Sequence, residues 1–205
     1  MSTVRGKTLG DGNLSLAQLD ARYSAKAEAG LLAASYFFTA SPMAQTTATT
    51  GSGTLRLLPW VVRNPLTIVR LGAEVTVVGD AGSKYRLGIY ADTGTCFPGA
   101  LVLDAGQIAG DSATVQELTI SQALQPGLYW VGGVAQSVTT TQPTMRTVGP
   151  SWTPPVPLSL GASIPGTGAQ TFGFLQGSVT GALPANFTST ATISGTCPRL
   201  FVKAA

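Results

Sequence analysis

The sequence has no histidine and only two cysteines among its 205 residues. Without histidine, the schemes in which an imidazole base activates a serine or cysteine nucleophile are excluded. The two cysteines, Cys96 and Cys197, are not closely spaced, and too few soft ligands remain for a zinc site. We therefore expect no metal and no cofactor. The sequence does not decide whether Cys96 and Cys197 form a disulfide, and assembly in a reducing cytoplasm disfavours one.

Charge is also scarce. Charged residues make up 10% of the chain, whereas about a quarter of the surface of a free soluble protein is charged. This shortage predicts that partner chains cover part of the surface. The net charge is +3 with no cluster of Lys and Arg, which argues against nucleic-acid binding. Residues 31–38, the longest apolar candidate, are too few to cross a bilayer, and no secretory signal is recognised, so we expect no membrane insertion.

Turn-forming residues are plentiful, with 25 Gly and 13 Pro, and they suit an all-β fold. Apolar runs at 85–91, 100–103, 115–120 and 128–135 are separated by turn formers, as in short antiparallel strands. In the first run Tyr85, Leu87 and Ile89 alternate with Arg86, Gly88 and Tyr90. Residues 128–135 are apolar on both faces, which predicts a central strand. Alternation of Val69, Leu71, Ala73, Val75 and Val77 with Arg70, Gly72, Glu74 and Thr76 predicts a strand with one buried face.

Three phrases carry a resemblance: Y-R-L-G-I-Y-A-D at 85–92, P-G-A-L-V-L-D-A-G at 98–106 and L-Q-P-G-L-Y-W-V-G-G-V-A at 124–135. Their order resembles a β-sandwich module of fibre, spike and tail-appendage proteins of tailed phages and phage-like particles. The resemblance implies an all-β, jelly-roll-like antiparallel β-sandwich. It further implies a virion protein that is assembled in the host cytoplasm, released by lysis, and binds a host receptor or surface glycan. Because fibre-like appendages are usually threefold, it also implies a homotrimer.

The first 40 residues have a different character. Ser15 to Gln18 forms a capping box, and Leu16, Leu19, Tyr23, Ala27 and Leu31 recur at helical spacing. The phrase L-A-Q-L-D-A-R-Y-S at 16–24 resembles the attachment segments of phage fibres. We expect an arm and short helix at 1–40, with 1–35 docking to other virion proteins, and a β-sandwich domain at 41–205. A helix that packs on its own sandwich is the alternative.

The segment from 137 to 198 carries Arg146 as its one charged residue. Such a stretch indicates contact with other subunits or with a neutral polar ligand, or else a set of long sandwich loops. Alternation of Phe172 with Phe174 and of Leu200 with Val202 predicts that strands from both ends of this segment close the sandwich. Pro59 restricts its own run to an edge or a bulge.

A glycan site requires exposed aromatic rings beside planar polar groups. The candidates for contact with a host cell-surface polysaccharide are Trp152, Tyr90, Asp92 and Gln136. Trp152 lies among Ser, Thr and Pro, so exposure is expected. Trp130 alternates with Leu128, which favours a place in the core.

Enzymatic readings have less support. Residues 92–94 copy the Asp-Thr-Gly triplet of aspartic proteases, but one copy lacks the second carboxylate, and these residues favour a turn. A polysaccharide-degrading spike using acids such as Asp104 and Asp111 remains an alternative. So does a purely structural adaptor or decoration protein. We expect a non-enzymatic appendage protein.

Overall fold

The computed structural model describes residues 31–40, 45–149, 172–193 and 195–205. The chain divides into two compact units, Met1–Gly30 and Leu31–Ala205. The expected arm, the helix and Trp152 lie outside the described residues. The boundary expected near Ala40 falls inside the second unit, because β1 (Tyr36–Phe38) pairs with the C-terminal strand.

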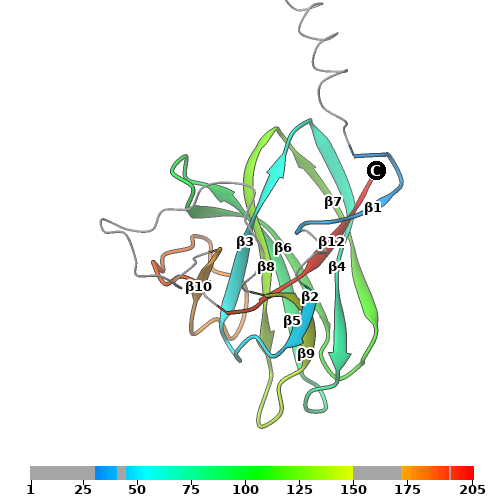
Figure 1. The fold of residues 1–205 in the computed structure, drawn as a ribbon, viewed down its shortest axis with the longest axis vertical. Coiled ribbons are helices and arrows are strands. Elements are labelled where there is room, and N and C mark those ends of the chain that lie inside the picture. Colours follow the sequence, from blue (N-terminus) through cyan, green and yellow to red (C-terminus); the bar gives the residue numbers. More distant parts are fainter. Residues whose placement is uncertain (1–30, 41–44, 150–171, 194) are drawn as a thin grey trace, which may run out of the picture. The chain divides into compact units, whose positions relative to one another are not determined.

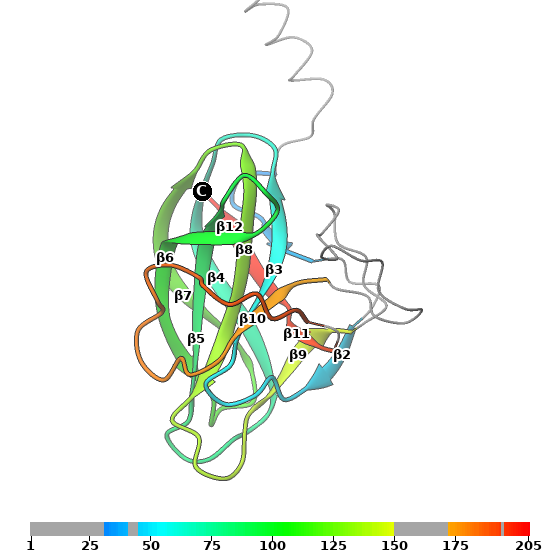
Figure 2. The same ribbon diagram turned by 90° about the vertical axis from the view of Figure 1, so that its left-hand side faces the viewer.

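Two antiparallel sheets pack face to face, as Figures 1 and 2 show. The first contains β1, β2 (Gln45–Ala48), β4 (Leu66–Val77), β7 (Val115–Leu124), β9 (Thr144–Val148), β11 (Cys197–Pro198) and β12 (Leu200–Ala204). The second has the order β10 (Phe174–Gln176), β3 (Leu55–Val62), β8 (Gly127–Gln136), β5 (Lys84–Asp92) and β6 (Pro98–Ala109). No helix occurs among the described residues. The all-β sandwich is therefore confirmed, and the finer jelly-roll arrangement stays a prediction.

The main core lies between the two sheets and follows the predicted alternation. On β5, Tyr85, Leu87 and Ile89 join this cluster, together with Val131 and Ala135 of β8. The opposite faces of the same strands feed a second cluster, which includes Tyr90, Trp130 and Val134. β8 lies in the middle of its sheet, which confirms the prediction of a central strand. Full burial of one large apolar side chain stabilises the folded state by about 1.5–3 kcal/mol relative to leaving that side chain exposed.

The β4 prediction is only partly confirmed. The buried side chains are Leu71, Ala73 and Val75. The register with β7 shifts between Ile68 and Arg70. This bulge buries Ile68, while Val69 stays only partly buried. Val77 is 55% exposed at the end of the strand. The prediction that both valines are core residues is therefore wrong. At Val69 the irregular register reverses the alternation, whereas Val77 is exposed at the end of the strand.

The outer face of the five-stranded sheet is covered by the C-terminal segment. Phe174, Val179, Leu183 and Phe187 pack onto this face as part of the second cluster. Leu183 lies over Gly88, where an added Cβ would come within 2.1 Å of Leu183 Cδ1. The described part of the uncharged segment thus contacts its own sandwich. The segment from 177 to 187, which we call the cover segment, buries two of the predicted glycan contacts, Tyr90 and Gln136. Asp92 is only partly buried.

Strands from both ends of the uncharged segment close the sandwich, as predicted. β10 pairs with Leu55 to Leu57 of β3, and β12 pairs with β4. Pro59 lies beyond the reach of β10, where β3 has β8 as its partner within the described strands. The proline therefore occupies the predicted edge position. Both cysteines are free: Cys96 follows β5 and Cys197 is buried in β11.

Candidate functional site

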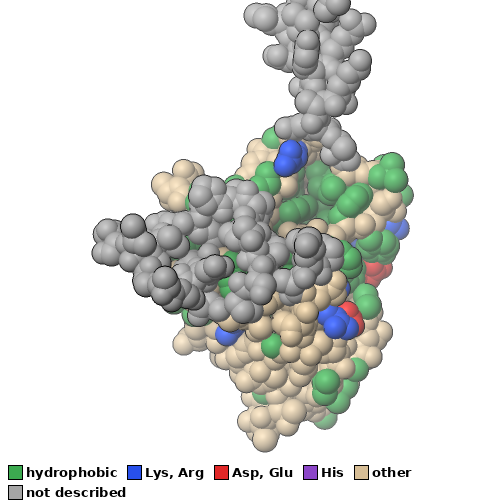
Figure 3. All heavy atoms as spheres, viewed as in Figure 1, with side chains coloured by type: hydrophobic (Ala, Val, Ile, Leu, Met, Phe, Trp, Pro, Cys, Tyr) green, Lys and Arg blue, Asp and Glu red, His purple; other side chains and the backbone are tan. Residues whose placement is uncertain are grey.

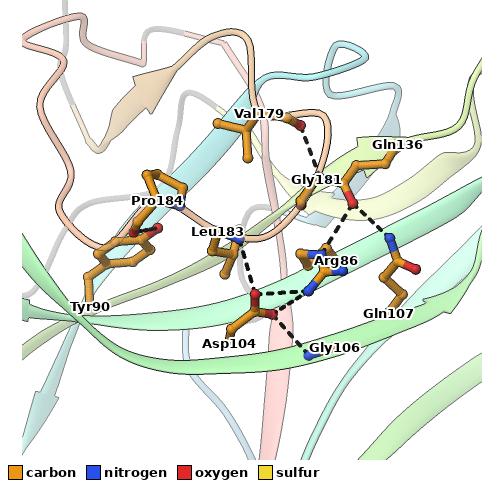
Figure 4. Close-up of polar contacts among 10 residues, drawn as sticks. All are labelled: Arg86, Tyr90, Asp104, Gly106, Gln107, Gln136, Val179, Gly181, Leu183 and Pro184. Carbon is orange, nitrogen blue, oxygen red and sulfur yellow. Dashed lines mark hydrogen bonds and ion pairs between the residues drawn. The ribbon is translucent and has the colours of Figure 1, made fainter.

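Gln136, a predicted glycan contact, lies in the interior and is 2% exposed. Its amide Nε2 donates to the carbonyl oxygens of Val179 and Gly181 at 3.0 and 2.7 Å. Its Oε1 accepts from Arg86 Nε at 3.3 Å and from Gln107 Nε2 at 2.8 Å (Figure 4). All of these partners belong to the sheet or to the cover segment. Gln136 therefore fastens the cover segment to β8 and offers no surface to a saccharide.

Tyr90 has the same role on β5. Its side chain is fully buried, and its hydroxyl donates to the Pro184 carbonyl at 2.9 Å (Figure 4). Burial raises the pKa of Tyr90 above its ordinary value, and the nearby Asp104 carboxylate raises it further. A ring in this position cannot stack on a sugar. The predicted glycan contacts at Tyr90 and Gln136 are therefore wrong for the same reason: the cover segment lies over both side chains, where a sugar would have to bind.

Asp92 ends β5 and organises the turn that follows. Its Oδ2 accepts from the amides of Gly94 and Cys96 at 2.6 and 3.3 Å. Gly94 has a φ of +90°, a conformation that favours glycine. Its Oδ1 accepts from Trp130 Nε1 at 2.9 Å, and Trp130 is fully buried. The turn interpretation of residues 92–94 and the core position of Trp130 are both confirmed.

Asp104 completes the network beneath the cover segment. Its carboxylate pairs with Arg86 at 2.8 Å and accepts from the amides of Leu183 and Gly106 at 3.0 and 3.2 Å (Figure 4). Burial by itself would raise the pKa of Asp104, but these donors outweigh it and hold the pKa below its ordinary value. The group is thus a fixed anion. A glycosidase acid needs a raised pKa, so Asp104 is a poor proton donor.

The outer face of the seven-stranded sheet differs, because large apolar side chains are exposed there. Tyr36, Phe38 and Val115 are 51%, 49% and 61% exposed. Figure 3 shows hydrophobic side chains gathered at the upper right of the view, where Figure 1 places β1, β12 and β4. A hollow of about 570 Å³ opens on this face, lined by Tyr36, Phe37, Phe38, Glu74, Val115, Glu117, Arg199 and Phe201. We call this the aromatic hollow.

A glycine creates the floor of the aromatic hollow. Phe38, Phe201, Gly72 and Glu117 form one row of paired positions across β1, β12, β4 and β7. A Cβ at Gly72 would lie 2.3 Å from Phe201 Cζ and 2.4 Å from the Gln116 carbonyl oxygen. Because the side chain is absent, the Phe201 ring lies directly over β4. Any other residue at position 72 would push this ring out of place.

Tyr36 crosses the hollow from β1 toward β7. Its ring meets the Phe201 ring edge-on, with centroids 5.8 Å apart and planes at 70°. Its hydroxyl donates to Glu117 Oε2 at 2.7 Å, and Glu117 Oε1 accepts from Arg70 Nε at 3.2 Å. The hydrogen bond to Glu117 raises the pKa of Tyr36. The ring is therefore held in place while half of its surface faces solvent.

Phe38 and Arg199 form the other side of the hollow. The guanidinium carbon of Arg199 lies 3.9 Å from the Phe38 ring centroid. Arg199 is 8% exposed, and its buried Nε has no hydrogen-bond partner within the described chain. Burial lowers the pKa of Arg199, although the nearby Glu74 carboxylate opposes this effect. Glu74 itself is held by Arg146, through contacts of 2.9 and 3.0 Å.

None of the aromatic hollow was among the predicted site residues. The available signal was the alternation of Phe201 and Lys203 with the core residues Leu200 and Val202. That pattern predicts a second face, but it does not show what lies beside it. Tyr36 reaches this face through the pairing of residues 36–38 with 201–203, which are far apart in the sequence.

No group of three or more His, Cys, Asp or Glu side chains that could hold a metal occurs in the described residues. The same part of the chain has no helix long and apolar enough to cross a membrane. No protein-family model matches the sequence, and no curated protein is significantly similar to it.

Proposed function

We propose that this chain is a structural appendage protein of a tailed phage or related particle, and that it binds a host surface glycan at the aromatic hollow without enzymatic activity. The observation that carries the proposal is the arrangement of Tyr36, Phe38 and Phe201 beside fixed polar groups around one hollow. Sugar rings stack on aromatic faces while neighbouring charged and polar groups take their hydroxyls. Half-exposed rings held by a rigid sheet suit this task.

The place on a particle is supported by the resemblance of residues 85–135 to appendage modules. Those residues fall on β5 to β8, the scaffold of the sandwich. The low charge of the chain suits a protein that is partly covered by other subunits. In a homotrimer docked through residues 1–35, three weak glycan sites would act together and raise the avidity.

The acids of the hollow favour binding over hydrolysis. Glu74 accepts two hydrogen bonds from Arg146, and these hold the pKa of Glu74 below its ordinary value. Glycoside hydrolysis needs a carboxylic acid that stays protonated until it reaches the substrate. An anionic Glu74 is better suited to accepting hydrogen bonds from sugar hydroxyls. A polysaccharide-degrading spike is accordingly the weaker alternative.

A purely structural adaptor is the second candidate, because the exposed rings of Tyr36 and Phe38 also suit a protein partner. An array of purified bacterial surface polysaccharides, probed with the full chain, separates the two. Phe38→Ala should weaken binding by about fivefold per site, equivalent to about 1 kcal/mol for one stacking contact. The melting temperature should stay nearly unchanged, since Phe38 is half exposed.

Val77→Ala is the matched control, because Val77 is an exposed apolar residue that does not line the hollow. Trp152, which lies outside the described residues, stays a proposed contact, and Trp152→Ala belongs in the same assay. Failure of the intact oligomer to bind any polysaccharide, with loss of particle incorporation in Phe38→Ala, would favour the adaptor. Equal loss in Phe38→Ala and Val77→Ala would remove the hollow from the site.

A further inference from the structure

The aromatic hollow contains a cation with no anion of its own. The Arg199 side chain is more than nine-tenths buried, and it forms no ion pair with the described residues. Its guanidinium carbon lies 3.9 Å from the centroid of the Phe38 ring. A buried guanidinium normally has its donors paired, because unpaired buried donors are costly. Arg199 Nε, which has no hydrogen-bond partner within the described chain, therefore indicates a ligand with an acceptor group.

The charges around Arg199 also favour an anion. The two acids of the hollow already have partners: Glu74 pairs with Arg146, and Glu117 pairs with Arg70. Lys203, on the same face, lies 5.2 Å from the Tyr36 ring centroid and forms no ion pair within the described chain. Two positive side chains thus remain uncompensated beside the rings.

We propose that the aromatic hollow selects an acidic sugar, in which a singly charged carboxylate pairs with Arg199 while the sugar ring packs against Phe38. The inference rests on the proposed glycan-binding function and names the class of glycan. An arginine fork matches the two oxygens of a carboxylate, so the contact gives orientation as well as attraction. A hollow of about 570 Å³ has room for a sugar unit.

The acceptor could also belong to a phosphate ester, because guanidinium groups bind both anions. Glu74 and Glu117 line the same hollow. Each is already paired with an arginine, so their charges do not by themselves separate a carboxylate from a phosphate. A sugar phosphodiester is also singly charged, and for this reason it is included as a separate probe.

The test uses one sugar backbone in two charge states: trigalacturonate and its fully methyl-esterified form. Binding of each to the full-length protein is measured by calorimetry at low salt. We expect the wild type to bind the free acid about tenfold more tightly than the ester, as one charge-assisted contact would give. Arg199→Gln should remove this preference, and Arg199→Lys, which keeps the charge but loses the fork, should retain part of it. Phe38→Ala should weaken both forms alike.

Melting temperatures show whether each variant is folded, and Lys203→Gln tests the second cation if Arg199→Gln does not fold. Loss of part of the preference in Lys203→Gln would support the proposal.

Equal binding of acid and ester by the wild type, with weaker binding of both to Phe38→Ala, would overturn the acidic assignment and leave the glycan-binding function standing. A preference that survives in Arg199→Gln would place the anion elsewhere. Tighter binding of a sugar phosphodiester than of trigalacturonate would overturn the assignment of the anion as a carboxylate. Absence of any glycan binding on the wider array would count against the proposed function itself.

Discussion

Replacing Asp92 by Ala tests whether this residue supports the fold or contacts a ligand. In the structure Asp92 Oδ1 is the acceptor for Trp130 Nε1, and Trp130 is fully buried. Loss of the acceptor leaves a buried indole N–H unpaired, at a cost of about 1–3 kcal/mol. The amides of Gly94 and Cys96 also lose their acceptor, which adds about 0.5–1.5 kcal/mol because a turn amide can bind water instead.

The expected total is about 1.5–4.5 kcal/mol, a large part of the roughly 5–15 kcal/mol by which a domain is stable. For a chain of this size the melting temperature should fall by roughly 3–18 °C. Thermal and urea denaturation measure the change. Asp92→Asn should lie between the wild type and Asp92→Ala, because one oxygen remains to accept from either Trp130 or the turn.

Asp111→Ala is the matched control. Asp111 also accepts from a turn amide, that of Gly82 at 2.7 Å, but the contact is exposed and involves no buried indole. Its loss of stability should be clearly smaller. If Asp92→Ala and Asp111→Ala are equally stable, the structural role of Asp92 is refuted. If Asp92→Ala keeps its stability but loses glycan binding, Asp92 is a contact residue after all.

Three further predictions concern the scaffold. Trp130→Ala should cost about 3–5 kcal/mol in urea denaturation, as a core truncation does, and a loss below that of a surface substitution would contradict its burial. Gly72→Ala should lower stability by about 1–3 kcal/mol through overpacking against the Phe201 ring and should also weaken glycan binding; an unchanged variant would contradict the close contact. Because the pKa of Asp104 is lowered in the folded state, its contribution is present above the unfolded pKa of about 4 and is lost as the pH falls through the lower folded value. Asp104→Asn should therefore make the free energy of unfolding depend less on pH in the acid range. An unaltered pH dependence would exclude Asp104 as a contributor to it.

The buried residues of a strand could be predicted from the sequence where burial follows the strand's own alternation of side chains. The alternation in β5 and β8 predicted which residues face each core, and Trp130 was placed correctly. The sequence pattern failed at Val69. The register irregularity there changes which face of the sheet the side chain points to, and the apolar–polar alternation of the sequence does not reveal it. A single extra residue in one strand is decided by the partner strand, and that partner is not visible locally.

The candidate site was less predictable for the same reason. Tyr90 and Gln136 have the residue types of a glycan site, but the cover segment about 45–95 residues further along buries them. Conversely, Tyr36 and Phe38 lie in the stretch at 1–40 that was expected to form an arm and a helix, and they line the aromatic hollow through the pairing of β1 with β12. Residue type indicates what a side chain can bind, whereas long-range pairing decides whether it is at the surface.

The most direct test of the central claim is a crystal structure of the full chain with the polysaccharide fragment that binds most tightly on the array. We predict a sugar ring in the aromatic hollow, packed against Phe38, with an acidic group within hydrogen-bond distance of Arg199. A fragment bound elsewhere, with the outer face of the seven-stranded sheet empty or covered by another copy of the chain, would contradict the account.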